Sequence, residues 1–257
     1  MKKENTAPRF AGLIATILGL ALTLFTRSNA TADGASTGAT LTFTASLILL
    51  IIGIVMLIAS FSPRSHRKTD TRTLTMAAMF AALCYVGFAY LRIDIPVGTE
   101  KTAFHLGNVF CVLSALFLGG LWGGMSGAVG LTIADPTSGY ITSAPKTLLL
   151  KLGTGLISGV VAHKCFHIGS SEKRSVPLSV ATVPSCASGM AFNVVADPTV
   201  GYFYKTYVLG VPQDAAKIWV KIGSLTTLVN AIVAEVVASI LYLALRPALK
   251  KNRLIPE

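Results

Sequence analysis

Two acidic residues stand in nearly identical heptapeptides of this chain. The segment Ala-Asp-Pro-Thr-Ser-Gly-Tyr at residues 134–140 returns as Ala-Asp-Pro-Thr-Val-Gly-Tyr at residues 196–202. Each copy follows an apolar segment and precedes a lysine in a similar context, Lys151 before Leu-Gly-Thr and Lys221 before Ile-Gly-Ser. A carboxylate and an ammonium group in a poorly hydrated place can pair with each other or hold a polar ligand. Internal repeats with a ligand site between the copies are common in transporters.

The repeat supports two interpretations. Proline disfavours the helical conformation in the residue before it, so Asp-Pro-Thr could simply end a helix. The matched lysines favour a shared functional surface, in which Asp135 with Lys151 and Asp197 with Lys221 form equivalent structures around a pocket, and each lysine neutralises a carboxylate or donates to the ligand. Each lysine could also snorkel toward the lipid headgroups. We expect two equivalent units, each made of a helix, a turn and a second helix that carries its lysine near the start.

Glu235 is the strongest single candidate among the intramembrane polar residues. It lies in the middle of an apolar run, between Ala234 and Val236. A carboxylate inside a membrane is costly without a partner, so such residues often serve function. At 100° per residue, Glu235 shares one side of its helix with Lys221, whereas Asn230 points to the other side. Glu235 is therefore a candidate site residue, and a structural hydrogen bond is the alternative.

Other polar and aromatic residues gather where helices are expected to end on one side of the membrane. His105 and Asn108 are three residues apart and share a helical face. Tyr140 and Tyr202 close the two copies of the repeat. Aromatic rings beside Lys and Asn suit a planar heterocyclic ligand. Helix capping and an interfacial aromatic belt explain the same positions without a ligand.

Residue patterns typical of enzymes are missing from the sequence. It has no phosphate-binding glycine loop, no metal-ligand cluster and no nucleophile–base constellation. The four cysteines show no paired spacing and are expected to be small apolar helix residues. We therefore expect neither enzymatic activity nor a metal or other cofactor.

The composition is that of an all-α integral membrane protein. Hydrophobic residues make up 53% and charged residues 13% of the 257 residues, whereas soluble domains carry about 25% charged residues. Eight apolar segments predict eight transmembrane helices: 10–25, 41–61, 74–91, 104–119, 121–134, 147–162, 176–196 and 219–245. The glycine-rich residues 119–124 divide the fourth from the fifth and predict a tight hairpin of closely packed helices.

The net charge of +11 is explained by membrane topology. With eight helices and a cytoplasmic N-terminus, most of the 22 Lys and Arg residues fall on the inner side, as the positive-inside rule requires. Both termini are then cytoplasmic, and both copies of the repeat face the exterior. Contact with anionic lipid accounts for the remaining positive charge, so no nucleic-acid partner is expected.

A basic linker at residues 62–72 marks a boundary between two parts of the chain. We predict an N-terminal pair of transmembrane helices with this linker at residues 1–70, a six-helix core at residues 71–250 and a tail at residues 251–257. The first helix resembles a secretory signal peptide, but its apolar run is longer than the core of such a peptide. We therefore expect the helix to remain in the mature protein.

Small residues recur at four-residue spacing in two places. Ala77 with Ala81, and Ala78 with Ala82, form two such pairs in the first core helix. Gly119, Gly123 and Gly127 form another run. Close internal packing of helices is the simplest explanation of both.

These motifs, in this order, resemble the substrate-binding S components of energy-coupling-factor (ECF) vitamin transporters, above all the riboflavin-type and hydroxymethylpyrimidine-type branch. The resemblance spans about residues 72–248 and rests on residues 104–108, 119–127, 134–140, 144–147 and 151–153. It implies a six-helix core that captures a vitamin or vitamin precursor from outside, in the plasma membrane of a prokaryote. A transmembrane coupling subunit and two ATPase subunits are the implied partners. The N-terminal helix pair lies outside this core.

The resemblance also implies roles for particular residues. Substrate contacts would come from residues 95–105 and from Lys151, Asn193, Tyr202 and Lys221. The first core helix would dock on the coupling subunit through a pair of alanines, either Ala77 with Ala81 or Ala78 with Ala82.

Two further functions fit the residues alone. An autonomous secondary transporter or channel would use Glu235 as an ion or proton site. A structural or assembly protein of the membrane would use the repeat for packing only.

Overall fold

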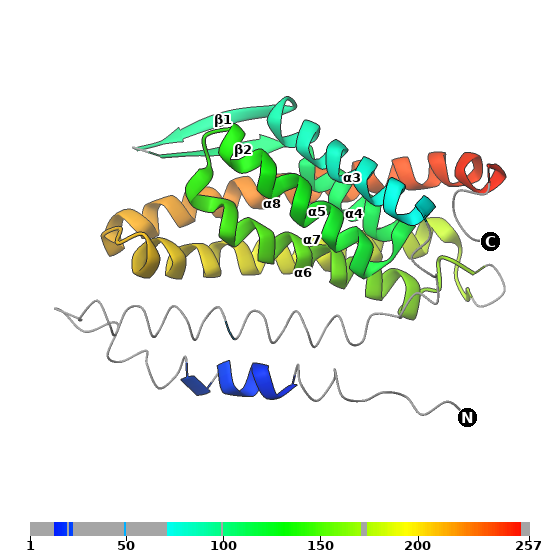
Figure 1. Ribbon diagram of the computed structural model, residues 1–257, viewed down its shortest axis with the longest axis horizontal. Coiled ribbons are helices and arrows are strands. Elements are labelled where there is room, and N and C mark those ends of the chain that lie inside the picture. Colours follow the sequence, from blue (N-terminus) through cyan, green and yellow to red (C-terminus); the bar gives the residue numbers. More distant parts are fainter. Residues whose placement is uncertain are drawn as a thin grey trace.

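The computed structural model describes residues 13–19, 21–22, 49, 71–98, 100–170 and 174–252. The predicted N-terminal helix pair and linker lie almost entirely outside these ranges, as does most of the tail. Within the described ranges the chain forms six long helices: α3 Thr71–Ala89, α4 Gly107–Leu118, α5 Gly120–Thr137, α6 Ala144–Val160, α7 Leu178–Phe203 and α8 Gln213–Lys251. Successive helices run in opposite directions, so the core is an up-and-down bundle (Figure 1).

The lengths and compositions of these helices suit a bilayer. Four helical segments are long and apolar enough to cross one: Thr71–Ala89, Ile141–Cys165, Leu178–Val208 and Gln213–Lys251. Large apolar side chains such as Leu121, Ile133 and Ile240 remain exposed on the bundle surface, as lipid contact requires. An integral membrane protein built almost wholly of helices is therefore confirmed. The total of eight helices and the cytoplasmic position of both termini stay predictions.

A two-stranded antiparallel hairpin interrupts the helical pattern and was not predicted. Strand β1 Arg92–Val97 pairs with β2 Glu100–His105, with Arg92 opposite His105. Gly98 begins the turn at a φ of 62°, a conformation that glycine adopts without steric cost. The hairpin follows α3 and leads into α4 at one end of the bundle (Figure 1). The prediction of an all-α fold is therefore nearly right, and within the described residues this hairpin is the one exception.

The predicted tight connection between two short helices is confirmed in α4 and α5. Gly119, at a φ of 85°, is the single residue between them. A Cβ on Gly123 would lie 2.3 Å from Cα of Ala115, so the two helices touch backbone to backbone. Helix α6 approaches α5 as closely, because a Cβ on Gly155 would lie 2.4 Å from Cα of Gly124. The glycines therefore pack the bundle internally, as their spacing predicted.

The two copies of the repeat adopt different conformations. In the first copy, α5 ends at Thr137 and Gly139 turns the chain at a φ of 82°. In the second copy, Pro198 lies inside α7, which runs on to Phe203 and into a π-helical turn at Tyr204–Val208. The expectation of two equivalent helix–turn–helix units is therefore wrong. The left-handed Gly139 that ends the first helix has no counterpart at Gly201, whose backbone remains helical.

Candidate functional site

A cavity of about 160 Å³ lies at the hairpin end of the bundle. Its walls come from both strands of the hairpin, chiefly β2, and from all six helices of the core. Phe88, Tyr140 and Trp219 supply aromatic surface, while four lysines, two aspartates and three asparagines supply polar groups. The cavity thus combines aromatic surface with a small set of polar groups, the usual character of a small-molecule site.

An ion pair joins α6 to α7 on one side of this cavity. Lys146 Nζ lies 2.7 Å from Asp197 Oδ1, and Thr227 of α8 donates a hydrogen bond of 2.8 Å to Asp197 Oδ2. The carboxylate is thereby satisfied at both oxygens. The expected pair of Asp197 with Lys221 is wrong, because Lys221 is exposed on α8 and does not line the cavity.

Lys151 enters the cavity from α6, two helical turns after its start. Its ammonium group donates a 2.8 Å hydrogen bond to Asn193 Oδ1 on α7, and Asn193 is only 1% exposed. No ion pair joins Lys151 to a carboxylate of the described residues, so the expected pair with Asp135 is wrong as well. An ammonium group carries three donors, and two of those on Lys151 therefore remain available to a ligand.

Asn230 of α8 fastens the hairpin to the bundle at the cavity wall. Asn230 Oδ1 accepts a 3.0 Å hydrogen bond from the backbone N–H of His105, and Asn230 Nδ2 donates one of 2.9 Å to the carbonyl oxygen of Ala103. Glu235 is half-buried further along α8 and does not line the cavity. The helical spacing correctly put Asn230 and Glu235 on different sides, but the side that faces the cavity is that of Asn230.

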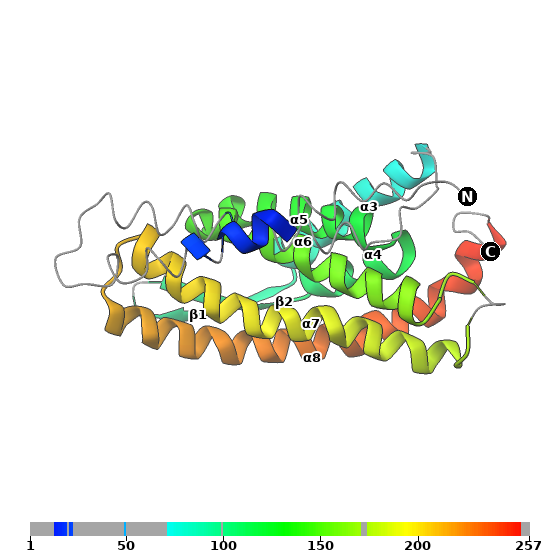
Figure 2. The ribbon, with the colours of Figure 1, turned by 90° about the horizontal axis from the view of Figure 1, so that it is seen from below.

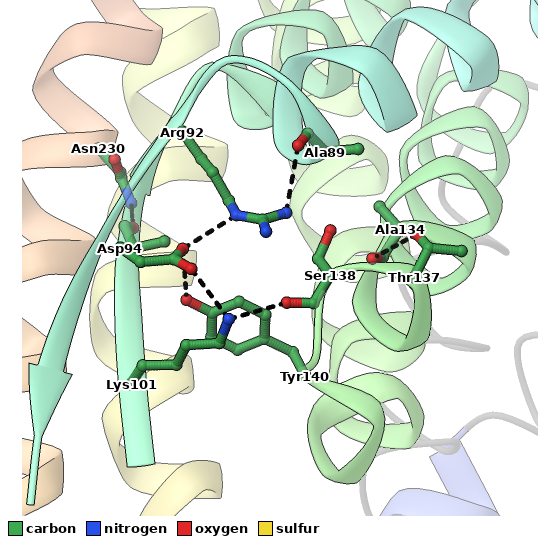
Figure 3. A network of polar contacts seen from close by, with 10 residues as sticks. Ala89, Arg92, Asp94, Lys101, Ala134, Thr137, Ser138, Tyr140 and Asn230 are labelled. Atoms are coloured by element: carbon green, nitrogen blue, oxygen red, sulfur yellow. Dashed lines mark hydrogen bonds and ion pairs between the residues drawn. The ribbon is translucent and has the colours of Figure 1, made fainter.

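A second set of contacts ties the hairpin to the turn after α5, as Figure 3 shows. Asp94 Oδ1 lies 2.9 Å from Arg92 Nε and accepts a 3.0 Å hydrogen bond from the Tyr140 hydroxyl, while Asp94 Oδ2 lies 2.9 Å from Lys101 Nζ. Lys101 also donates to the carbonyl oxygen of Ser138. Two hydrogen bonds, from the Tyr140 hydroxyl to Asp94 and from Lys101 to the Ser138 carbonyl oxygen, thus hold the hairpin against the turn after α5.

Protonation of this network follows from its contacts. Burial raises the pKa of Asp94, but hydrogen bonds from Lys101 and Tyr140 outweigh it and hold the pKa below its usual value. The stabilisation is therefore present above the usual carboxyl pKa and is lost as the pH falls through the lowered one. Burial, with the Lys151 ammonium nearby, lowers the pKa of His105 to about 3, so its ring is neutral at physiological pH.

The predicted site residues divide into two groups. His105, Asn108, Lys151, Asn193, Asp135, Tyr140 and Asp197 line the cavity. Tyr202, Lys221 and Glu235 do not, and Tyr202 packs edge-on against Phe203 instead. Within the described part of the chain, no group of three His, Cys, Asp or Glu side chains could hold a metal ion.

Several lining residues escaped the sequence analysis. Asn230 was passed over in favour of Glu235 on the opposite side of the helix, and Lys146 appeared only within a motif. Lys205 and Trp219 also line the cavity, with Lys205 Nζ 4.4 Å from the centre of the Trp219 ring. Lys146 lies in the first turn of α6, just after the first copy of the repeat, and this position was the signal that could have identified it.

Comparison with known proteins identifies a family. Residues 68–247 match the family model described as "ECF-type riboflavin transporter, S component". No curated protein and no solved structure matches the chain.

Proposed function

The chain belongs to the S-component family of ECF-type riboflavin transporters, and from this membership we propose that it captures a vitamin or vitamin precursor for an ATP-driven importer. The observation that carries the proposal is the cavity at the hairpin end of the bundle. Lys151, Asn193 and Asn108 offer polar contacts there, and Phe88, Tyr140 and Trp219 offer aromatic surface. A small heterocyclic molecule suits such a mixture.

The distribution of charge supports capture from outside. Counted over the whole sequence, 14 of the 22 Lys and Arg residues belong to segments expected on the side opposite the hairpin, and 8 belong to the hairpin side. The C-terminal end of α8, which carries Arg246, Lys250 and Lys251, lies at the end of the bundle opposite the hairpin (Figures 1 and 2). The positive-inside rule places such residues in the cytoplasm. The cavity and the hairpin then face the exterior. The same rule places both ends of the core inside, and membership of the transporter family supports a location in the plasma membrane of a prokaryote.

Delivery of the substrate needs partners in this proposal, because the sequence has no nucleotide-binding motif. A transmembrane coupling subunit and two ATPase subunits would provide the energy. The alternative function, an autonomous carrier, depended on Glu235 as an ion or proton site. Glu235 does not line the cavity. We therefore retain the capture subunit alone.

The docking surface on the coupling subunit can be narrowed to one pair of alanines. Ala77 is buried, and the carbonyl oxygen of Ala81 lies against Gly130 of α5, so this pair packs inside the bundle. Ala78 and Ala82 are exposed one helical turn apart. Small residues on an exposed face let a partner helix approach closely. We propose Ala78 and Ala82 as the docking pair.

Replacing the exposed pair should separate uptake from binding. Ala78→Leu with Ala82→Leu is expected to abolish ATP-driven uptake in proteoliposomes that contain the complete transporter, because two bulky side chains push the partner helix away. Ligand binding by the isolated protein should stay within about twofold, since surface substitutions away from a site cost little. Ala77→Leu with Ala81→Leu is the matched control and should damage the fold itself. Normal uptake by the exposed-pair variant would contradict the docking assignment.

Mass spectrometry of the purified protein tests the capture function. A tightly bound vitamin or precursor should copurify in detergent, and it should raise the thermal stability of ligand-free protein when it is added back. Absence of any bound small molecule, together with no stabilisation by B vitamins or their precursors, would count against the proposal.

A further inference from the structure

Two arginines meet at the end of the bundle opposite the hairpin. Arg246 lies near the end of α8, and Arg174 lies shortly before the start of α7. Arg246 Nη2 donates a 2.7 Å hydrogen bond to the carbonyl oxygen of Ile168, and Arg174 Nε donates one of 3.0 Å to that of Val176. Both guanidinium groups lie near the hydroxyl of Tyr242, which is 2% exposed. The fold thus gathers two permanent positive charges around one buried tyrosine.

Close packing fixes the positions of the two arginines. The ring centre of Tyr242 lies 4.7 Å from that of Phe117 on α4. Ile168, whose carbonyl oxygen accepts from Arg246, is 0% exposed, and its backbone N–H donates a 3.0 Å hydrogen bond to Ala162 in the turn after α6. The guanidinium groups are therefore held in place without a ligand. Such preorganisation favours binding, because less conformational freedom is lost when a ligand arrives.

The charge of this arginine pair is not neutralised by the protein. Among the described residues, no ion pair joins Arg174 or Arg246 to a carboxylate. Arg174 Nη1 is buried and has no hydrogen-bond partner. A buried donor without an acceptor costs free energy, and two like charges held close together repel each other. An anion between the two guanidinium groups would remove both costs.

The surroundings of the arginine pair indicate which anion fits. The positive-inside rule places this end of the bundle in the cytoplasm, so the two arginines lie at the level of the inner lipid headgroups. Val180 and Val183 near the start of α7, and Leu245 near the end of α8, are exposed apolar side chains at the same end. Basic pockets between transmembrane helices on the cytoplasmic side bind anionic headgroups. A phospholipid suits both parts, with its phosphate on the arginines and its acyl chains on the apolar surface.

We propose that Arg174 and Arg246 bind the phosphate group of an anionic phospholipid from the inner leaflet, between the start of α7 and the end of α8. Guanidinium groups suit this role, because their planar fork of N–H donors matches phosphate oxygens. The bound lipid completes Arg174 Nη1 and links the two helices at their cytoplasmic ends. The site lies at the opposite end of the bundle from the cavity, so it uses the orientation of the protein in the membrane but not its capture function.

Thermal unfolding of the delipidated protein in detergent tests this site with three additions. Dioleoylphosphatidylglycerol should raise the Tm by about 5 °C, because a ligand that binds only the folded state stabilises it. Dioleoylphosphatidylcholine has the same acyl chains without net charge and should change the Tm little. Inorganic phosphate lacks the chains and should also have little effect. Equal stabilisation by the two lipids would overturn the anion site, and stabilisation by phosphate equal to that by phosphatidylglycerol would assign the site to a free anion and overturn the lipid.

Substitution of the arginines shows whether the effect comes from this site. Arg174→Gln and Arg246→Gln should each lose most of the stabilisation by phosphatidylglycerol, since each removes one of the two phosphate donors. Lys251→Gln is the matched control, because it removes one positive charge from an exposed side chain near the end of the same helix, and it should keep the full effect. Equal stabilisation of all three variants would mean that the lipid responds only to overall charge, which would overturn the site.

A conservative pair of variants decides the question if a glutamine variant fails to fold. Arg174→Lys and Arg246→Lys keep the positive charge but lose the planar fork. Each should retain only part of the stabilisation by phosphatidylglycerol. Undiminished stabilisation of both lysine variants would show that no guanidinium group binds the phosphate and would overturn the proposal.

Discussion

Lys146→Ala should destabilise the protein strongly, by about 2–4 kcal/mol. The substitution leaves the Asp197 carboxylate without its cation between α6 and α7. The side chains of this pair are only 15% and 26% exposed, so water replaces the lost partner poorly. The expected cost therefore lies above the 0–1 kcal/mol of an exposed pair and toward the 3–5 kcal/mol of a buried one. Thermal unfolding in detergent should show a lowered Tm.

Another ion pair of the same chain provides the matched control. Lys217 and Asp214 lie 3.2 Å apart near the start of α8, with side chains that are 61% and 95% exposed. Lys217→Ala removes a lysine from an ion pair as well, but solvent screens this pair, so the Tm should hardly change. Equal changes in Tm for the two substitutions would show that the ion pair of Lys146 with Asp197 does not stabilise the fold.

Asn230→Ala should release the hairpin from the cavity. The change removes both hydrogen bonds from α8 to β2 and leaves His105 N–H and the Ala103 carbonyl oxygen unpaired. Opening of the hairpin exposes the ligand to solvent, so we expect the Kd to rise about 10- to 100-fold, mainly through faster dissociation. Stopped-flow measurement of ligand release would show the change directly.

Two variants make this prediction specific. Asn230→Asp keeps the acceptor for His105 N–H and loses the donor to Ala103, so its release rate should lie between those of the original protein and the alanine variant. Asn252→Ala removes an asparagine that bonds only within the exposed end of α8, and it should leave the release rate unchanged. A release rate unaffected by Asn230→Ala would mean that the hairpin does not close the cavity.

The bundle could be predicted from the sequence because apolar length and glycine spacing act locally. The division between α4 and α5 at Gly119 is the clearest case, since a single glycine at positive φ permits the turn. The hairpin escaped prediction although the apolar residues of β1 alternate with Arg92, Asp94 and Pro96, because the segment is only six residues long and a proline within it argues against a strand. Its pairing is fixed by contacts with α5 and α8 that the local sequence does not contain.

The site could be predicted only in part, for a related reason. The repeat correctly drew attention to Lys151, Asp135 and Asp197, all of which line the cavity. The predicted partners were wrong, because the prediction assumed that both copies of the repeat have the same structure. The second copy instead continues as a helix. Asp197 instead meets Lys146, which is 51 residues away in the chain and is brought close by the packing of α6 on α7. Helical periodicity likewise separates Asn230 from Glu235 without showing which of them faces the cavity.

Calorimetric titration in the absence of ATP tests the central claim most directly, that this cavity binds the substrate. The ligand identified by mass spectrometry should bind the isolated protein at one site with submicromolar affinity, about −8 kcal/mol or better. Lys151→Met should weaken that binding at least tenfold, because methionine has no ammonium group and cannot donate the hydrogen bonds that Lys151 offers in the cavity. Tight binding that is unchanged in Lys151→Met would place the substrate elsewhere and contradict the account.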